Sequence, residues 1–212
     1  MSARLLPAGG EGALTEAAGL LQSGEVVAIP TETVYGLAAL PADEPLRRLL
    51  EIKRRSSDKG IQLLIDSIEQ ARTLVRMTEA AQALAERFWP GGLTLVLELR
   101  PGVELPALLS GGRTTVGLRL PDHDVPRRLA RELGPLAASS ANISGRPPAT
   151  KAEHVLASVG NELPLILDGG PVRGGVSSTV VLCPSDGSVP LILREGALNR
   201  REVLAALAGS TA

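Results

Sequence analysis

Aromatic residues are nearly absent from this chain of 212 residues, which contains one Trp, one Tyr and one Phe. Hydrophobic residues still make up 44% of the sequence, so Ala, Val, Leu and Ile must fill any core. Cysteine is equally scarce. The single Cys183 excludes an intrachain disulfide framework and a cysteine metal cluster, which fits a reducing compartment.

A strong net charge and long apolar runs are also missing. The formal net charge of -1 argues against a whole-molecule surface for polyanions. No apolar stretch approaches the roughly 20 residues that span a bilayer. The N-terminal sequence MSARLLPAGGEG lacks the apolar segment of a secretory signal. We therefore expect a cytoplasmic protein that does not enter a membrane.

Several familiar catalytic motifs do not occur. The sequence has no Gly-Lys pair and therefore no Walker A loop, and it has no G-x-S-x-G segment. Neither His123 nor His154 belongs to an H-E-x-x-H motif. These absences exclude the recognisable forms of a P-loop enzyme, a serine hydrolase of the α/β class and a zinc protease.

Short apolar runs alternate with helical patterns for most of the chain, and further apolar runs cluster near its end. This order predicts an α/β fold with a mixed sheet, forming one domain over residues 1–212 and closing with a helix at residues 199–208. Side chains suited to capping predict helix starts at Thr15, Ser67, Asp124 and Thr150.

Polar clusters follow the apolar runs. Because ligands of open α/β sheets bind where the loops at strand ends converge, these clusters predict a shared pocket. The clusters are PTETVYG (30–36), KRRSSDKG (53–60), WPGGLT (89–94), SSANISGRPPAT (139–150), LDGGPVRGGVSST (167–179) and LREG (193–196).

Together and in this order, the clusters resemble the YrdC/Sua5 family over residues 13–198. The resemblance implies a YrdC-like single domain with a twisted mixed sheet flanked by helices. It also implies a nucleotidyltransferase that forms L-threonylcarbamoyladenylate and pyrophosphate from L-threonine, bicarbonate or CO2, and ATP. The product would supply the N6-threonylcarbamoyladenosine at position 37 of tRNA through a separate tRNA threonylcarbamoyl transferase complex. Mg2+ is expected with the ATP, since proteins seldom bind it in cages of their own.

The resemblance implies one set of residues for L-threonine. A guanidinium is the natural bidentate partner of a carboxylate, and hydroxyls suit a substrate that itself carries an OH. Without the family, Thr33 and Tyr35 could equally belong to a turn after a strand, and Arg119 could point to solvent. The implied threonine-binding residues are Thr33, Tyr35, Arg119, Ser140 and Ser178.

A second set is implied for ATP, with Lys53 and Arg55 also catalytic. Cations at this position would neutralise the triphosphate and the departing pyrophosphate. Gly60 and Leu64 depart from the family, which usually has Pro at the first position and in some members a ligand-contacting His at the second. The implied ATP-binding residues are Lys53, Arg55, Lys59, Thr115, Asn142, Thr150 and Arg194.

Two other functions stay open. A concave surface lined by Lys and Arg could bind RNA without turnover, although the near-neutral charge and the lack of aromatic stacking residues weigh against this. A carbamoyl-transfer domain, like the related part of hydrogenase-maturation proteins, is the second alternative.

Overall fold

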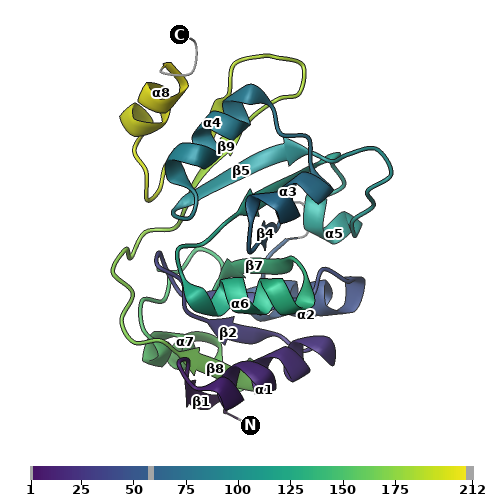
Figure 1. Ribbon diagram of the computed structural model, residues 1–212. Coiled ribbons are helices and arrows are strands. Elements are labelled where there is room, and N and C mark those ends of the chain that lie inside the picture. Colours follow the sequence, from purple (N-terminus) through teal and green to yellow (C-terminus); the bar gives the residue numbers. More distant parts are fainter. Residues whose placement is uncertain (1, 57–59, 209–212) are drawn as a thin grey trace.

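A ten-stranded sheet runs through the whole molecule in the computed structural model, which describes residues 2–56 and 60–208 (Figure 1). The predicted mixed sheet flanked by helices is confirmed. The strands are β1 (Arg4–Pro7), β2 (Val27–Ile29), β3 (Gly36–Ala39), β4 (Gln62–Leu64), β5 (Leu93–Glu98), β6 (Thr115–Arg119), β7 (Leu136–Ser140), β8 (Leu165–Asp168), β9 (Thr179–Leu182) and β10 (Leu191–Arg194).

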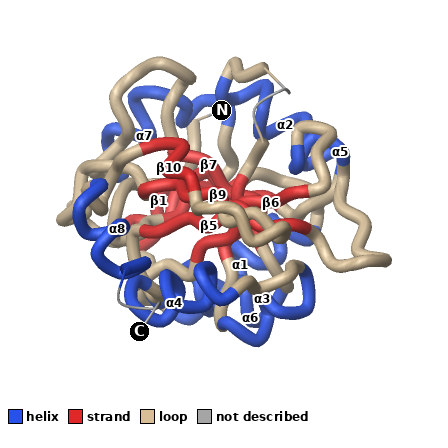
Figure 2. The backbone as a smooth tube through the Cα atoms, turned by 90° about the horizontal axis from the view of Figure 1, so that it is seen from above, coloured by secondary structure: helices blue, strands red, loops and turns tan. Residues whose placement is uncertain are grey.

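Helices cover both faces of this sheet. Figure 2 shows α2, α5 and α7 on one side and α1, α3, α4 and α6 on the other. The closing helix begins one residue later than predicted. The helices are α1 (Glu11–Gln22), α2 (Asp43–Lys53), α3 (Ile68–Leu74), α4 (Glu79–Phe88), α5 (Ala107–Ser110), α6 (Asp124–Leu133), α7 (Ala152–Val159) and α8 (Arg200–Ala208), with a 3-10 turn at Gly160–Glu162.

The strand order is β1-β8-β2-β3-β7-β4-β6-β5-β9-β10, so neighbours in the sheet are often distant in sequence. Parallel pairs join β1 to β8, β2 to β8, β4 to β6 and β5 to β9. The other pairs are antiparallel. As a result, the segments before β3, β5 and β9 meet: the Gly175 N–H donates to the Thr33 carbonyl at 2.8 Å, and the Thr179 N–H donates to the Gly92 carbonyl at 2.9 Å.

Small aliphatic side chains pack the core, as the scarcity of aromatics requires. Along β2, Val27 and Ile29 pack into the cluster that includes α1 and α6, whereas Ala28 packs into the larger cluster on the opposite face. Cys183 is buried in the larger cluster, and burial raises the pKa of its thiol to about 12. This cysteine therefore serves packing.

The predicted helix starts have mixed outcomes. Ser67 caps α3 as predicted, and its side chain accepts a hydrogen bond from the Gln70 N–H at 3.2 Å. The start at Thr15 is wrong, because α1 begins at Glu11. The start at Asp124 is wrong as a cap, because the His123 ring accepts from the Val125 N–H and caps α6 instead.

Candidate functional site

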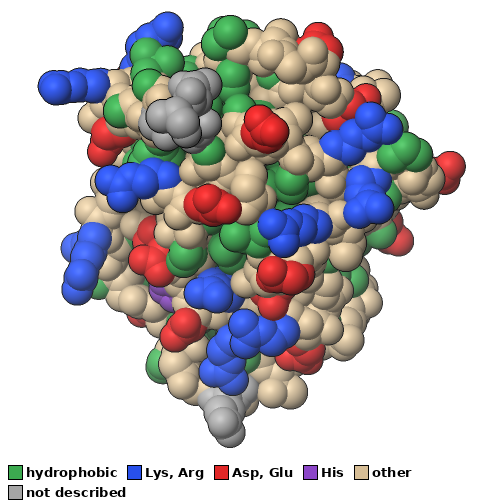
Figure 3. Space-filling view, turned by 45° about the horizontal axis from the view of Figure 1, so that its top comes forward, with side chains coloured by type: hydrophobic (Ala, Val, Ile, Leu, Met, Phe, Trp, Pro, Cys, Tyr) green, Lys and Arg blue, Asp and Glu red, His purple; other side chains and the backbone are tan. Residues whose placement is uncertain are grey.

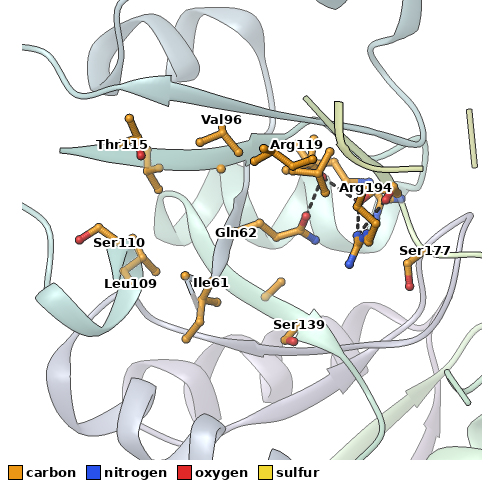
Figure 4. A pocket seen from close by; sticks show the side chains of 18 of the residues that line it. Ile61, Gln62, Val96, Leu109, Ser110, Thr115, Arg119, Ser139, Ser177 and Arg194 are labelled. Carbon is orange, nitrogen blue, oxygen red and sulfur yellow. Dashed lines mark hydrogen bonds between the residues drawn. The ribbon is translucent and has the colours of Figure 1, made fainter. Parts of the chain in front are cut away.

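A cavity of about 560 Å³ lies against the central strands, and its size is within the usual range for small-molecule sites. Figure 4 shows part of its walls, to which α5 and the strands β4, β5, β6, β7, β9 and β10 contribute. Six of the residues predicted for substrate or nucleotide binding line this one cavity, although they are widely separated in sequence. They are Arg55, Thr115, Arg119, Ser140, Ser178 and Arg194.

Arg119, at the end of β6, is held by three acceptors. Its side chain is 3% exposed, and its Nη2 donates to Glu32 Oε1 and to Thr33 Oγ1, both at 2.7 Å. Its Nε donates to the Gly91 carbonyl at 3.1 Å. The guanidinium is therefore fixed in orientation before any ligand arrives, which lowers the entropic cost of binding an anion.

Thr33 lies behind Arg119 and is not among the residues that line the cavity. Its hydroxyl lies 3.0 Å from that of Thr31, which also donates to the Val34 carbonyl at 2.6 Å. These bonds close a tight polar turn directly after β2. The structure thus brings Thr33 to the site through Arg119, and its direct contact with threonine stays a prediction.

Tyr35 is fully buried and also lies outside the cavity lining. Its hydroxyl donates to the Gly170 carbonyl at 2.8 Å and accepts from the Gly169 N–H at 3.1 Å. Burial, together with the nearby Asp168 carboxylate, raises the pKa of Tyr35 to about 12. The only tyrosine therefore anchors the glycine-rich segment after β8 to the segment after β2.

Lys53 ends α2 with its side chain turned inward, only 2% exposed. Its Nζ donates to the Ser140 carbonyl and, at 2.8 Å, to the Asn142 carbonyl. Burial, and secondarily the charge of Arg55, lowers its pKa to about 8. Lys53 is not among the cavity-lining residues, so in this structure it supports the 140–142 segment from behind.

Arg55 does line the cavity. Its Nη1 donates to Ser139 Oγ at 3.1 Å, and its Nη2 donates to the Gly60 carbonyl at 2.8 Å. The residue between it and Lys53 has the left-handed backbone that ends α2, with φ of 49° at Arg54. Because of this turn, the side chains of Lys53 and Arg55, both predicted to bind ATP, point in different directions. Lys59 lies outside the described residues.

Asn142 and Thr150 do not line the cavity. The Asn142 amide donates to the Ile143 carbonyl at 3.0 Å and to the Arg146 carbonyl at 2.6 Å, which closes its own loop. The predicted helix start at Thr150 is wrong, because α7 begins at Ala152 and has no side-chain cap. Both roles toward ATP stay predictions.

Gln62 and Thr94 are cavity-lining residues that the sequence analysis missed. Thr94 Oγ1 lies 2.7 Å from Gln62 Oε1 and 2.7 Å from Ser178 Oγ. Gln62 interrupts the apolar run IQLLI, and this polar interruption was the available signal. By contrast Leu64, two residues further along β4, is 1% exposed in the core beside α6 and is not a cavity-lining residue.

The cavity combines cationic and apolar walls. Four arginines, Arg55, Arg113, Arg119 and Arg194, supply positive charge, and the carboxylate of Glu32 partly offsets it at Arg119. Such a site can hold an anion that carries a flat apolar group, such as a nucleotide. The aliphatic wall consists of Val34, Ile61, Val96, Leu109, Val116, Ala138, Val180, Leu182 and Leu193.

Over residues 2–56 and 60–208, no three His, Cys, Asp or Glu side chains gather in a way that could hold a metal ion. Nor does this part of the chain contain a helix that is both long and apolar enough to cross a bilayer.

The sequence matches a known protein family over most of its length. The Sua5/yciO/yrdC family model, described as "Telomere recombination", matches residues 19–196. The chain belongs to this family. A Bacillus subtilis (strain 168) relative named threonylcarbamoyl-AMP synthase is 42% identical over 197 residues, covering 92% of this chain and 56% of the relative.

Two other family members add detail. The Idiomarina loihiensis protein of the same name is 35% identical over 171 residues, covering 77% of this chain and 89% of that protein. A crystal structure of Pyrococcus abyssi Sua5 complexed with L-threonine superposes with a TM-score of 0.84 at 41% identity, covering 91% of this chain and 56% of that one. The chain thus spans little more than half the length of the Bacillus and Pyrococcus family members.

Proposed function

We propose that this chain is an L-threonylcarbamoyladenylate synthase, a nucleotidyltransferase that uses L-threonine, bicarbonate or CO2, and ATP. The observation that carries the proposal is the convergence of six predicted binding residues, drawn from residues 55–194, on one cavity of about 560 Å³. The synthase names of the relatives and the threonine complex of the Pyrococcus protein support the same reaction.

Two steps in one cavity make up the proposed reaction. The amine of threonine adds to CO2 and loses a proton, which gives N-carboxythreonine. The new carboxylate attacks the α-phosphorus of ATP, and the bond to the leaving pyrophosphate breaks. Both reactants in the second step are anions, so the chain's main contribution is to hold them together and screen their repulsion.

The Arg and Lys side chains are proposed to bind different parts of the substrates. Arg119 is proposed to bind the threonine carboxylate, because its fixed guanidinium faces the cavity. Arg55 and Arg194 are proposed to bind the phosphates, with Lys53 fixing the backbone of residues 140–142 beside them. Lys59, Asn142 and Thr150 remain proposed ATP contacts. Guanidinium groups suit these tasks because they stay charged at all ordinary pH values.

Mg2+ is proposed to arrive with ATP. The cavity-lining residues of the described chain include hydroxyls and an amide but no Asp or Glu, so they fit a cation held mainly by phosphates and water. A bound Mg2+ would neutralise charge on the departing pyrophosphate.

A cytoplasmic location and a separate tRNA threonylcarbamoyl transferase complex as recipient of the product complete the proposal. Direct RNA binding is less favoured. On the face shown in Figure 3, Lys and Arg side chains are interspersed with Asp and Glu side chains, whereas an RNA-binding face concentrates positive charge.

One assay tests the reaction. The purified chain is incubated with ATP, Mg2+, bicarbonate and one amino acid at a time, and pyrophosphate is measured. Release that depends on threonine and bicarbonate is expected. Tight binding of duplex RNA without turnover would favour an RNA-binding module, and release that requires carbamoyl phosphate would favour carbamoyl transfer.

A further inference from the structure

A chain of hydrogen bonds crosses one wall of the cavity and ends at Gln62. Arg194 Nη2 donates to the Ser178 carbonyl at 2.8 Å and lies 3.5 Å from Ser178 Oγ. Ser178 Oγ lies 2.7 Å from Thr94 Oγ1, which donates to Gln62 Oε1 at 2.7 Å. Ser178 and Thr94 are each 2% exposed, so their hydroxyls have little access to water and rely on each other for hydrogen bonding.

The direction of the protons along this chain follows from simple counting. Thr94 has one hydroxyl proton, and the Gln62 carbonyl oxygen can only accept, so that proton points to Gln62. The Ser178 proton must then point to Thr94. Arg194 is consistent with this assignment, because a guanidinium can only donate and the Ser178 hydroxyl oxygen can accept from it. Since Oε1 of Gln62 is occupied by Thr94, the Nε2 group with its two N–H donors is the end that faces the cavity.

The local backbone makes room for this arrangement. Gly117 of β6 faces both residues, and a Cβ there would lie 3.2 Å from Thr94 Cγ2 and 3.5 Å from Gln62 Cβ. Figure 4 shows the Gln62 carboxamide projecting into the cavity below Arg119, with Arg194 beyond it. Gln62 thus offers neutral donors to the cavity near Arg119 and Arg194.

We propose that Gln62 determines the use of bicarbonate or CO2, by donating a hydrogen bond to an oxygen of the one-carbon group. This inference rests on the proposed synthase reaction. The threonine carboxylate has Arg119, and the phosphates have Arg55 and Arg194. The one-carbon group forms between the amine and the α-phosphorus, where a neutral donor can orient it. A cation there would pair with the attacking carboxylate and weaken it as a nucleophile.

Bicarbonate dependence separates this role from a structural one. Pyrophosphate release is measured in degassed buffer while bicarbonate, threonine and ATP are varied one at a time with the other two saturating. Gln62→Met keeps the length of the side chain and removes its donors. Its KM for bicarbonate is expected to rise about tenfold, the effect of one lost hydrogen bond, while its KM for threonine stays within about threefold. Gln22→Met, at an exposed position near the end of α1, is the matched control.

Two more variants keep the test decisive if Gln62→Met folds poorly. Gln62→Glu retains an acceptor for Thr94 but places a negative charge beside the one-carbon group, so its KM for bicarbonate should rise further. Thr94→Val leaves the Gln62 amide in place but no longer fixes its orientation. The rise in the KM for bicarbonate should therefore be smaller than in Gln62→Met. Folding of each variant is checked by its thermal midpoint.

The outcomes distinguish the two proposals. If the wild-type chain releases no pyrophosphate in response to threonine, the proposed function fails. If it does so, and the Gln62 variants keep the wild-type KM for bicarbonate or raise all three KM values equally, the inference about Gln62 is overturned while the synthase reaction stands.

Discussion

Arg119 Nη2 lies 2.7 Å from Glu32 Oε1, so a guanidinium that is 3% exposed has its counter-charge within the chain. Glu32 is more accessible, with a side chain that is 23% exposed. Its Oε2 atom is buried and has no hydrogen-bond partner in the described part of the chain. The pair therefore fixes Arg119 from behind, and the cavity side of the guanidinium is presented to a ligand.

Glu32→Gln should lower both stability and threonine affinity. The amide cannot neutralise Arg119, and removing one partner of a largely buried pair is costly, so we expect the free energy of unfolding to fall by about 2 kcal/mol. The KM for threonine should rise because Arg119 is less firmly oriented. Denaturant unfolding and pyrophosphate release measure the two effects. Glu86→Gln, on the exposed surface of α4, is the control; equal effects in the two variants would contradict this account.

Lys53→Met tests a second buried charge. The variant leaves the carbonyls of Ser140 and Asn142 without their donor, and we expect unfolding to become easier by about 2 kcal/mol at pH 7. Pyrophosphate release should fall as the 140–142 segment loses its support. Lys151→Met, at an exposed position, is the control.

The stability difference between the wild type and Lys53→Met should depend on pH. The pKa of Lys53 is lowered from 10.5 to about 8 in the folded chain. Below pH 8 both states hold the proton and the difference is constant. Between pH 8 and 10.5 the unfolded state binds more protons, so the contribution of Lys53 to stability rises with pH. Denaturant unfolding at intervals from pH 7 to 10 measures this. A flat or falling difference would show that the pKa is not lowered.

The mixed sheet was predictable because apolar runs are a local pattern, although β1 and β3 were not expected from the sequence. The shared pocket was predictable because polar clusters follow the apolar runs. Four of the six predicted cavity-lining residues, Arg55, Ser140, Ser178 and Arg194, came from these clusters, whereas Thr115 and Arg119 lie within β6 and were implied by the family resemblance. Contacts between segments that are distant in sequence and meet across the sheet were harder to predict. Tyr35 meets Gly169 and Gly170 only because β2 and β8 are neighbours, and nothing in the segment around Tyr35 reveals that pairing.

The direction in which a side chain points was the other feature that the sequence did not reveal. Lys53 and Arg55 are two residues apart and were assigned one role, but the left-handed turn between them sends one inward and the other to the cavity. Predicted helix starts failed for two reasons: α1 and α7 begin without a side-chain cap, and α6 is capped by a residue outside the usual set. His123 caps α6 although Asp124 follows it, because the ring nitrogen of His123 reaches the Val125 N–H.

Arg55→Ala should reduce turnover without unfolding the chain. Arg55 lines the cavity and makes hydrogen bonds to Ser139 Oγ and the Gly60 carbonyl, both at the edge of the core. Loss of one cation that stabilises the departing pyrophosphate should lower kcat by about 100-fold to 1000-fold. The control is Arg47→Ala, on the exposed surface of α2. Wild-type kcat in a folded Arg55→Ala would remove this residue from the proposed phosphate site.

Gly196→Ala should displace the turn that follows β10. A Cβ at Gly196 would lie 2.1 Å from the Ser177 carbonyl oxygen, and the backbone on both sides would have to move. Because Arg194 is two residues away, we expect weaker ATP binding along with lower stability. Gly12→Ala is the control, since a Cβ there meets nothing within 4 Å in α1 and should be neutral or slightly stabilising. Unchanged ATP binding in Gly196→Ala would contradict this account of the turn.

Because Tyr35 is the only tyrosine, its ionisation can be followed directly. Burial and the Asp168 carboxylate disfavour the phenolate, so the absorbance change of tyrosinate should have its midpoint near pH 12 in the folded chain and near 10 in denaturant. A folded-state midpoint near 10 would show that the hydroxyl is not held as described.

Tyr35→Phe then tests what that hydroxyl does. Removal of the oxygen leaves the Gly169 N–H without its acceptor and the Gly170 carbonyl without its donor. We expect a loss of about 1–2 kcal/mol in the free energy of unfolding and faster amide exchange confined to residues 169–175. The backbone bonds from Val172 to Thr150, Gly174 to Glu32 and Gly175 to Thr33 would still hold the far end of this segment. Ser23→Ala, which removes an exposed hydroxyl bonded to the Leu20 carbonyl, should leave that exchange unchanged. If Tyr35→Phe speeds exchange across the whole sheet instead, the tyrosine stabilises the core generally and does not specifically anchor the glycine-rich segment.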